Sequence, residues 1–445
     1  MVINEVLTPL VVGAVYLALW AAISETVDHD RGLGKLAMHP ISVGLALGVY
    51  ATSWTFFGSV GYARRFGYDF LAISMGVLLS CLAIPVIWAP LARLVHQHNF
   101  SSVADLIAYR YQSQAAGLLI TVFMLLSMLP YISLQIRTVT ETAHFLAGDQ
   151  APANLGLVYA IVLGSFAVAL GARYADPRAQ RPGLIATLAG ESLVKLLAIT
   201  ILGAVTLHGH FDGLAGLDAF LTAHPEKLEH MFSPVRDLGW VSLLLVAFFA
   251  AFLLPRQFHV AFVESRSPRA LRHAMWVLPL LLLLIHLPLP LLYWAGEAKF
   301  AGAVSPDRYV LAVADGPLLR LLTFIGGLSA SSAMLLVSSM ALSAMVVHHA
   351  VIPAWGRRDL SHKRLVQMRR AVVAALVVSG FLFHSLVPRA ESLVDLGLVS
   401  FAAVLQLAPG ILGALFWQRG TRRGLVLGIC AGTLVWVAII AIPLL

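Results

Sequence analysis

Apolar stretches of about 20 residues recur along this chain, and each is long enough to cross the hydrocarbon core of a membrane. Residues of the set AVILMFWYC make up 59% of the 445, whereas only 12% are charged. A water-soluble domain carries roughly 25% charged residues because its surface must be hydrated. None of the polar segments is long enough to form such a domain. We therefore expect an all-α, polytopic membrane protein.

The pattern predicts about twelve transmembrane helices. We place them at 7–24, 40–62, 68–94, 114–147, 153–173, 183–207, 237–255, 274–295, 318–347, 366–387, 393–417 and 423–445. Two polar connections, 208–236 and 296–317, are long enough to carry short surface helices. The segment Phe100–Tyr111 begins with serine residues that can cap a helix, and its apolar spacing is typical of an interfacial helix.

Lysine and arginine are distributed unevenly between alternate loops. One set holds twenty of them, in the loops 25–39, 93–113, 173–182, 255–273, 348–370 and 418–423. The other set holds seven, namely Arg64, Arg65, Lys227, Arg236, Lys299, Arg308 and Arg389. Since Lys and Arg are retained on the cytoplasmic side, the sequence predicts that the N-terminus lies outside. The net charge of +8 then reflects topology, and we expect no nucleic-acid partner.

The middle of the second helix, residues 50–61, combines hydroxyl, aromatic and glycine residues. Small residues allow two helices to pack closely. They also suit a locally unwound helix, whose freed backbone groups bind a ligand or an ion at membrane depth. The spacing alone leaves both interpretations open.

Charged residues lie near the middle of the sixth helix. Glu191 and Lys195 are four residues apart, so they share one helix face and can neutralise each other. Charges at this depth are costly and face a partner or a wet cavity. The pair is therefore either an internal ion-pair staple or a coupling element for a proton or another ion. Arg137 and Glu141 repeat the spacing nearer the outer interface, where a structural role is expected, and Gln135 is suited to line a polar cavity.

Motifs for other chemistries are missing from the sequence. There is no Walker A motif, which excludes an ATP-driven pump within the chain. The histidines lack the cysteine or carboxylate neighbours of a metal site. We expect no catalytic residue, no metal and no cofactor, and hence no enzyme.

Five segments carry a resemblance to a known family. They are Trp54-x3-Gly58-x2-Gly61, Phe100–Tyr111, Gly190–Lys195, Leu254–Glu264 and Ala408–Gly424, the last continuing to Gly428 and Gly432. Together they resemble the sodium/solute symporter (SSS) family. They are most similar to the symporter-like input domain of bacterial carbon-source-responsive sensor histidine kinases.

The resemblance implies a LeuT-like fold, a 5+5 inverted repeat with a leader helix and a trailing helix. The leader would be 7–24, repeat one about 40–207, repeat two about 237–417, and the trailing helix 423–445. Because five crossings are an odd number, the second repeat enters the membrane inverted. The solute would bind near mid-membrane, against broken second and seventh helices.

The resemblance also implies site residues. The family's substrate positions fall on Trp54, Phe57, Gly58, Ser59 and Gln135, and its sodium site falls on the backbone carbonyls of Gly48 and Ala51 with Gly326 and Ser329. Tyr50 stands where many sodium-coupled members have Asp, and Ala330 replaces a second hydroxyl residue. Since a hard cation needs oxygen ligands, this site is degraded. We expect coupling to protons rather than strictly to sodium, with Glu191 and Lys195 as the coupling pair.

These features predict a secondary-transporter module in the bacterial inner (plasma) membrane. It would bind a small organic solute and translocate it by alternating access, with a proton or sodium ion as co-substrate. The resemblance alone indicates an amino acid such as histidine. The alternative is the sensory input domain of a two-component sensor histidine kinase, with little net transport and a fused or downstream kinase as partner. A channel or membrane anchor is a third class, which the lack of a continuous polar pore-lining face disfavours.

Twelve crossings from an outside N-terminus would also leave Leu445 outside. A kinase works only in the cytoplasm, so a further helix would have to precede it. We therefore expect this chain to be a fragment of a longer sensor protein.

Overall fold

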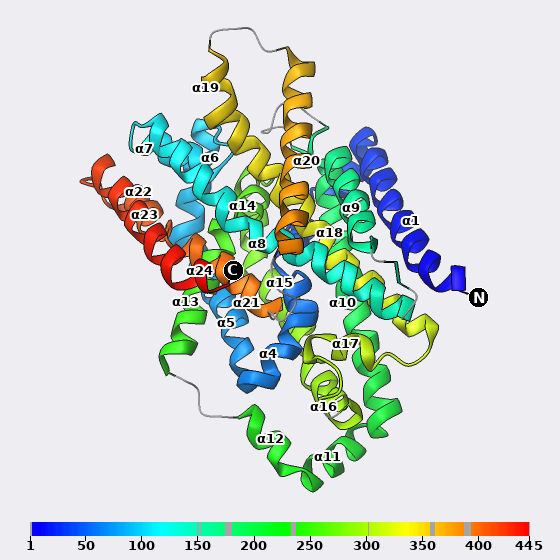
Figure 1. Ribbon diagram of the computed structural model, residues 1–445. Helices are drawn as coiled ribbons and strands as arrows, with labels where there is room; N and C mark the ends of the chain where they lie inside the picture. The colour runs from blue at the N-terminus through cyan, green and yellow to red at the C-terminus, as the bar shows by residue number, and fades with distance from the viewer. Residues whose placement is uncertain are drawn as a thin grey trace.

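The computed structural model describes residues 2–148, 151–152, 154–173, 180–232, 237–300, 302–356, 361–386 and 393–444. Over these residues the chain is helical and contains no strand. Long helices pack into a bundle, and short helices lie at both ends (Figure 1). The predicted all-α fold is confirmed. Five basic residues of the loop comparison lie outside the described residues, namely Arg178, Arg236, Arg357, Arg358 and Arg389.

The helices of the first half are α1 (Val2–His29), α2 (Arg31–Ala37), α3 (Pro40–Ala46), η1 (Leu47–Tyr50), η2 (Trp54–Gly58), α4 (Ser59–Phe66), η3 (Gly67–Phe70), α5 (Leu71–Leu82), η4 (Ile84–Trp88), α6 (Ala89–His98), α7 (Val103–Arg110), α8 (Gln114–Ala147), α9 (Leu155–Gly171) and α10 (Pro182–Phe211). Those of the second half are α11 (Leu214–Ala223), α12 (Pro225–Met231), α13 (Asp237–Leu253), α14 (Pro255–Phe258), η6 (His259–Glu264), α15 (Pro268–His286), α16 (Leu289–Phe300), η7 (Pro306–Arg308), α17 (Tyr309–Ala312), α18 (Pro317–Val346), η8 (Val347–Val351), α19 (Ile352–Trp355), α20 (His362–Leu386), α21 (Leu393–Leu405), α22 (Ala408–Phe416), α23 (Arg422–Trp436), η9 (Val437–Ala441) and α24 (Ile442–Leu444). The expected interfacial helix is α7, and the expected surface helices are α11, α12, η7 and α17.

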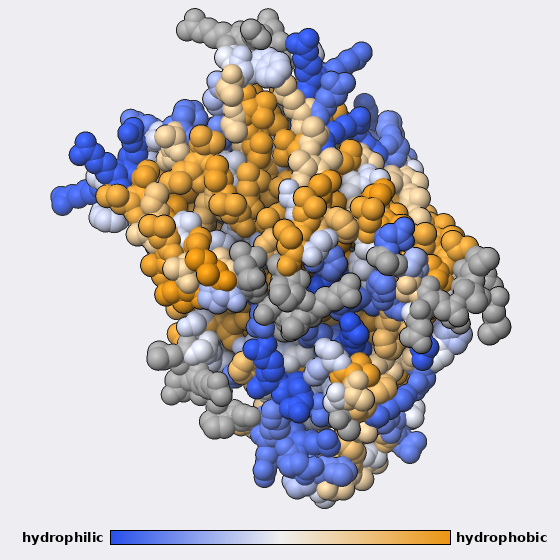
Figure 2. All heavy atoms as spheres, in the orientation of Figure 1, coloured by the Kyte–Doolittle hydropathy of each residue, from blue (hydrophilic) through white to orange (hydrophobic). Residues whose placement is uncertain are grey.

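The number of membrane-spanning helices is close to the prediction of about twelve. Among the described residues, nine helices are long and apolar enough to span, or up to eleven if two bent pairs count as one span each. The shortfall from twelve to eleven is helix α9, which has only 17 residues and is shorter than the other spans. Apolar side chains cover the middle of the visible face, and most hydrophilic ones gather towards its ends (Figure 2).

Loops that are rich in Lys and Arg meet at one end of the bundle, which we call the basic end. Its contacts are Arg173–Glu25, Gln180 with the Glu264 carbonyl, His96 with the Ser265 carbonyl, His349–Asp105, and Arg110 with the Trp417 and Gln418 carbonyls. Ion pairs at the opposite end are Arg64–Glu297, Arg65–Asp395 and Arg308–Glu141. The predicted division of alternate loops between two ends is therefore confirmed.

Two of the spanning helices are broken. In the first, η1 ends at Tyr50, Ala51 has extended backbone (φ −74°, ψ 100°), and helix resumes at Trp54. Of the two interpretations of this segment, the structure therefore shows the unwound helix.

The second break lies at Leu254, whose backbone is extended (ψ 136°), and the flanking helices Gly239–Leu253 and Pro255–Glu264 meet at 46°. Pro255 causes it, because a proline disfavours helical backbone in the residue before it. The predicted loop beginning at 255 is therefore wrong, since the span continues to Glu264. This continuation moves Arg256 from a loop into the membrane.

Candidate functional site

A lysine fills the break in the first broken helix. Lys195, on α10, donates from Nζ to the carbonyl oxygens of Ala51 (2.7 Å) and Gly48 (3.2 Å). Both carbonyls face the ammonium group. No backbone N–H of the described residues donates to the Ala51 carbonyl, because the helix unwinds here, whereas the Gly48 carbonyl also accepts from the Ala51 backbone N–H (3.0 Å). Lys195 is only 1% exposed. The two backbone positions that the sequence assigned to an ion are thus bonded to a side-chain cation.

Glu191 lies one turn before Lys195 but has a different partner. Its Oε1 accepts a hydrogen bond from Ser332 of α18, and its Oε2 is buried without a partner. Of the ion pairs found among the described residues, none joins Glu191 to Lys195. The two residues share a helix face, as their spacing requires, but the lysine reaches the broken helix instead of the carboxylate. The direct staple expected from spacing alone is not formed.

The α18 half of the expected ion site has contacts of its own. Ser329 Oγ donates to the Gly326 carbonyl (2.8 Å) within the same helix. A side chain at Gly326 would collide with Ala198 and Phe56, so this glycine permits a close helix contact. The structure thus links Gly48 and Ala51 to Lys195, and Ser329 to Gly326.

Two residues of α8 meet the unwound segment directly. Gln135 accepts a hydrogen bond from Ser53 Oγ at 2.8 Å, and the hydroxyls of Tyr131 and Thr52 lie 2.7 Å apart. All four side chains are at most 1% exposed. Gln135 was expected at the site, and Thr52 and Ser53 are hydroxyl residues of the segment 50–61 that the sequence marked. Only Tyr131 was not identified from the sequence.

The remaining expected substrate residues point towards two other helices. Trp54 Nε1 donates to the Val394 carbonyl of α21 (3.2 Å), and Gly58 also faces Val394. Phe57 lies over Gly327 of α18. Ser59 is fully buried, and its Oγ has no hydrogen-bond partner. These four residues line the continuation of the broken helix, but the structure does not bring them together on one face with Gln135.

The second break presents two polar side chains, Arg256 and Gln257. Gln257 Nε2 donates to the Leu47 carbonyl (3.2 Å), which joins the second break to the first. The Arg256 guanidinium lies 4.6 Å from the ring centre of Tyr131 and 5.8 Å from that of Phe401. Both polar residues are fully buried. Sequence reasoning assigned Arg256 to a loop, although an arginine next to a Leu-Pro pair in an apolar segment was a signal that could have identified it.

Towards the basic end the site is closed by a buried ionic network. Glu264 accepts from the Arg181 guanidinium (3.0 Å), from the Arg181 backbone N–H (2.9 Å) and from His259 Nε2 (3.0 Å). Arg181 and Glu264 are 3% and 0% exposed. This network ties η6 to the start of α10.

A second ionic contact at the basic end joins α7 to η8. Asp105 Oδ1 lies 2.8 Å from His349 Nε2 and 3.5 Å from His348 Nδ1, and Oδ2 accepts from Ser101. Burial alone would raise the pKa of the Asp105 carboxyl, but the hydrogen bonds from His348, His349 and Ser101 hold this pKa well below its usual range.

At the opposite end, Asp307 of η7 closes the site. Its Oδ2 accepts from the Leu393 backbone N–H (3.2 Å), and its Oδ1 lies where a side chain at position 61 would be, so only glycine fits there. Burial raises the pKa of Asp307 to about 6, against the lowering effect of the Leu393 bond, and the Glu141 carboxylate adds to the rise. The Arg181–Glu264 network and the Asp307–Leu393 hydrogen bond therefore lie on opposite sides of the two helix breaks.

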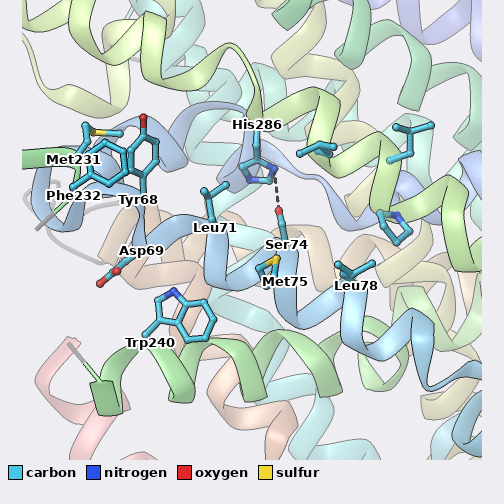
Figure 3. Close-up of a pocket in the computed structure, with 13 residues that line it drawn as sticks. Tyr68, Asp69, Leu71, Ser74, Met75, Leu78, Met231, Phe232, Trp240 and His286 are labelled. Atoms are coloured by element: carbon cyan, nitrogen blue, oxygen red, sulfur yellow. Dashed lines mark hydrogen bonds between the residues drawn. The ribbon is translucent and has the colours of Figure 1, made fainter. Parts of the chain in front are cut away.

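A large apolar groove, about 760 Å³ in volume, lies elsewhere. It is lined by residues of η3, α5 and α15 and by Met231, Phe232 and Trp240, with a hydrogen bond between His286 and Ser74 on its wall (Figure 3). None of its lining residues belongs to either helix break. An apolar groove between spanning helices is suited to lipid tails, so we do not assign the solute to it.

Known proteins similar to this chain are symporters. Residues 33–171 match the model of the sodium:solute symporter family. YodF, an uncharacterized symporter of Bacillus subtilis (strain 168), is 25% identical over 400 residues, which cover 86% of this chain and 75% of YodF. YhjB, an uncharacterized symporter of the same organism, is 23% identical over 451 residues, covering 95% and 86%.

The fold also has a solved counterpart. The substrate-bound, outward-open structure of a Na+-coupled sialic acid symporter has a TM-score of 0.70, with 97% of each chain covered and 12% identity. At this identity the likeness concerns the fold alone. It confirms the LeuT-like fold expected from the sequence.

Proposed function

We propose that this chain, a transporter of the sodium:solute symporter type, moves a small organic solute by alternating access and is coupled to protons rather than strictly to sodium. The solute would bind where the two broken helices meet. Two broken helices that are joined by the Gln257–Leu47 hydrogen bond support the transporter among the three function classes.

The position of the Lys195 ammonium carries the coupling proposal. Backbone carbonyl oxygens are ligands that a hard cation prefers, and the break frees the carbonyl of Ala51 while that of Gly48 keeps one backbone hydrogen bond. Lys195 binds both of them. A tethered cation that occupies these oxygens supplies the positive charge a sodium ion would otherwise bring. Protonation and deprotonation of Lys195, with Glu191 as nearby carboxylate, would then replace sodium binding and release.

The solute contacts follow from the same breaks. We assign Gln135 to solute binding because its amide meets Ser53 at the unwound segment. We assign Trp54, Gly58 and Ser59 to the wall of the solute site that faces away from the basic end. We assign Phe57 to the contact between this site and α18. We assign Gly326 and Ser329 to the α18 side of the ion site on the strength of the family resemblance; their hydrogen bond joins them to each other.

An amino acid such as histidine remains the proposed solute on the strength of the family resemblance. Neutral hydroxyl and amide groups beside aromatic rings suit a small molecule with polar and apolar parts. We also propose the division into repeat one (about 40–207) and repeat two (about 237–417). Its support is that each repeat begins with a broken helix.

The proposed location is a bacterial inner membrane with the N-terminus outside. Its support is the gathering of the Lys- and Arg-rich loops at one end, which the positive-inside rule assigns to the cytoplasm.

Solute uptake into proteoliposomes tests the proposal. Purified protein is reconstituted, and radiolabelled L-histidine and other L-amino acids are offered under an inward proton gradient or an inward sodium gradient. We expect uptake that follows the proton gradient and persists without sodium. The Lys195→Met variant should lose proton-driven uptake. Lys299→Met, which changes an exposed lysine paired with Asp315, should retain this uptake.

Each other outcome has a definite meaning. Uptake that requires sodium and ignores the proton gradient would refute proton coupling. Ligand binding without uptake under either gradient would refute transport and favour the sensory-input alternative.

A further inference from the structure

Arg256 lies at the second helix break and is a cation without a hydrogen bond. Its side chain is 0% exposed, and none of Nε, Nη1 and Nη2 has a partner. The guanidinium instead lies beside the rings of Tyr131 and Phe401, whose centres are 5.3 Å apart, and it interacts electrostatically with the Tyr131 hydroxyl. The five N–H groups of arginine lie in one plane, so contact with ring faces does not satisfy the hydrogen-bonding edge.

No carboxylate of the described residues compensates this charge by an ion pair with Arg256. Lys195, the other buried cation of the site, is within electrostatic reach and adds to the positive potential. Charges at membrane depth almost always pair with an opposite charge or face a wet cavity. Arg256 has the charge, the burial and the free donors of a group whose partner comes from outside the chain.

We propose that the transported solute carries a carboxylate and that Arg256 binds it. The proposal rests on the transport function proposed above and specifies the chemical class of its solute. A guanidinium edge matches a carboxylate with two parallel N–H···O hydrogen bonds, which are stronger and more selective than bonds to a neutral carbonyl.

Two further buried atoms near Arg256 are free to bind the rest of the molecule. Gln257 Oε1 has no partner, although its Nε2 is bound to the Leu47 carbonyl. Tyr50 Oη is also without a partner, and its ring lies 6.0 Å from that of Phe401, which Arg256 also contacts. An acceptor and a hydroxyl beside the cation suit an amino or hydroxyl group near the carboxylate. The class is therefore a small carboxylic acid with such a polar neighbour.

Matched acids and amides test this proposal. Binding to the purified full chain in nanodiscs is measured by the shift in its melting temperature, with four pairs as probes: L-histidine and L-histidinamide, L-alanine and L-alaninamide, L-lactate and lactamide, pyruvate and pyruvamide. We expect at least one acid to raise the melting temperature and its amide to have no effect. Arg256→Gln should weaken the acid about 10- to 100-fold, the effect of losing hydrogen bonds to a charged group. Arg320→Gln, which changes an exposed arginine, should bind like the parent.

The ligand-free variants show whether Arg256 is instead a structural residue. Arg369 is equally buried but donates to the Gly171 carbonyl, so Arg369→Gln should lower the melting temperature. Arg256→Gln should not lower the melting temperature of the ligand-free protein. The proposal is overturned if no acid binds, if an acid and its amide bind equally, or if Arg256→Gln binds the acid like the parent.

Uptake measurements separate this inference from the proposed function. If Arg256-dependent binding of an acid occurs without uptake, transport fails and the carboxylate site stands. If Arg256→Gln still takes up the solute at the parent rate, transport stands and the assignment of Arg256 fails.

Discussion

The two helix breaks each hold a buried cation, but only one cation is satisfied. Lys195 donates to two carbonyls at its break, and that of Ala51 has no backbone donor among the described residues. Arg256 lies against the rings of Tyr131 and Phe401, and none of its nitrogens has a hydrogen-bond partner. The first break therefore supplies the ligands of its own cation, whereas the second leaves the charge of Arg256 without a carboxylate. Our proposal that the first break serves coupling and the second serves recognition rests on this difference.

A third buried cation, Arg181, serves as a reference for the stability effects at Lys195 and Arg256. Arg181 is paired conventionally with Glu264, so Glu264→Gln leaves Arg181 buried without an opposite charge. We expect the free energy of unfolding to fall by about 3–5 kcal/mol, the largest effect predicted here. Thermal unfolding in nanodiscs measures it, with Glu226→Gln, an exposed carboxylate, as control. An unchanged melting temperature would mean that the network does not stabilise the closed state.

Removing the satisfied cation should be the next most costly change. Lys195→Met leaves the Ala51 carbonyl buried without a donor, whereas the Gly48 carbonyl keeps the Ala51 backbone N–H, and the free energy of unfolding should fall by about 1–3 kcal/mol. The same unfolding assay measures it, with Lys299→Met as control. If the two variants unfold alike, Lys195 does not hold the break together, and its contrast with Arg256 disappears.

Removing Arg256, the cation without a hydrogen bond, should raise the free energy of unfolding rather than lower it. Without ligand, Arg256→Gln replaces a buried charge that has no hydrogen bond, so the free energy of unfolding should rise by about 1–2 kcal/mol. Unfolding of the ligand-free variant, compared with Arg369→Gln, measures it. A clear loss of stability would place Arg256 beside Lys195 as a structural cation.

The smallest effect concerns a contact away from both breaks. Asp105→Asn removes the ionised partner of His348 and His349 and should cost about 1 kcal/mol near neutral pH. Because folding holds the pKa of Asp105 well below the unfolded value of about 4, its stabilisation is fully present above pH 4 and is lost only as the pH falls towards the low folded pKa. The difference in stability between parent and variant should therefore persist from pH 7 down to pH 4. Asp315→Asn, an exposed control, should follow the parent throughout. A difference that disappears between pH 7 and pH 4 would contradict the ionic interpretation.

Much of the fold could be predicted from the sequence because hydropathy and loop charge are local properties. The apolar stretches predict the spanning helices, and the serines before Val103 predict α7. The failures lie where a helix is neither long nor regular. Helix α9 is short for a span, and the Leu254–Pro255 break resembles a helix end followed by a loop.

The candidate site was only partly predictable. Gln135, Glu191 and Lys195 could be identified because polar residues are rare in apolar stretches. Their partners could not, because Ser53 and Gln135 are 82 positions apart, and Lys195 and Ala51 are 144 apart. Helical spacing suggested that Lys195 would bond to Glu191, yet the freed carbonyls compete for the same ammonium group.

By itself, the sequence determined an all-α membrane protein, the division of its loops between two ends and the rare polar residues within its helices. These follow from hydrophobicity, charge and periodicity, which act over one or two helical turns. Only the tertiary structure decided that the second helix unwinds, that Lys195 binds its carbonyls and that Arg256 is buried without a partner. Each of these depends on which distant helix lies opposite a freed backbone group or a buried charge, and a single chain segment carries no record of that neighbour.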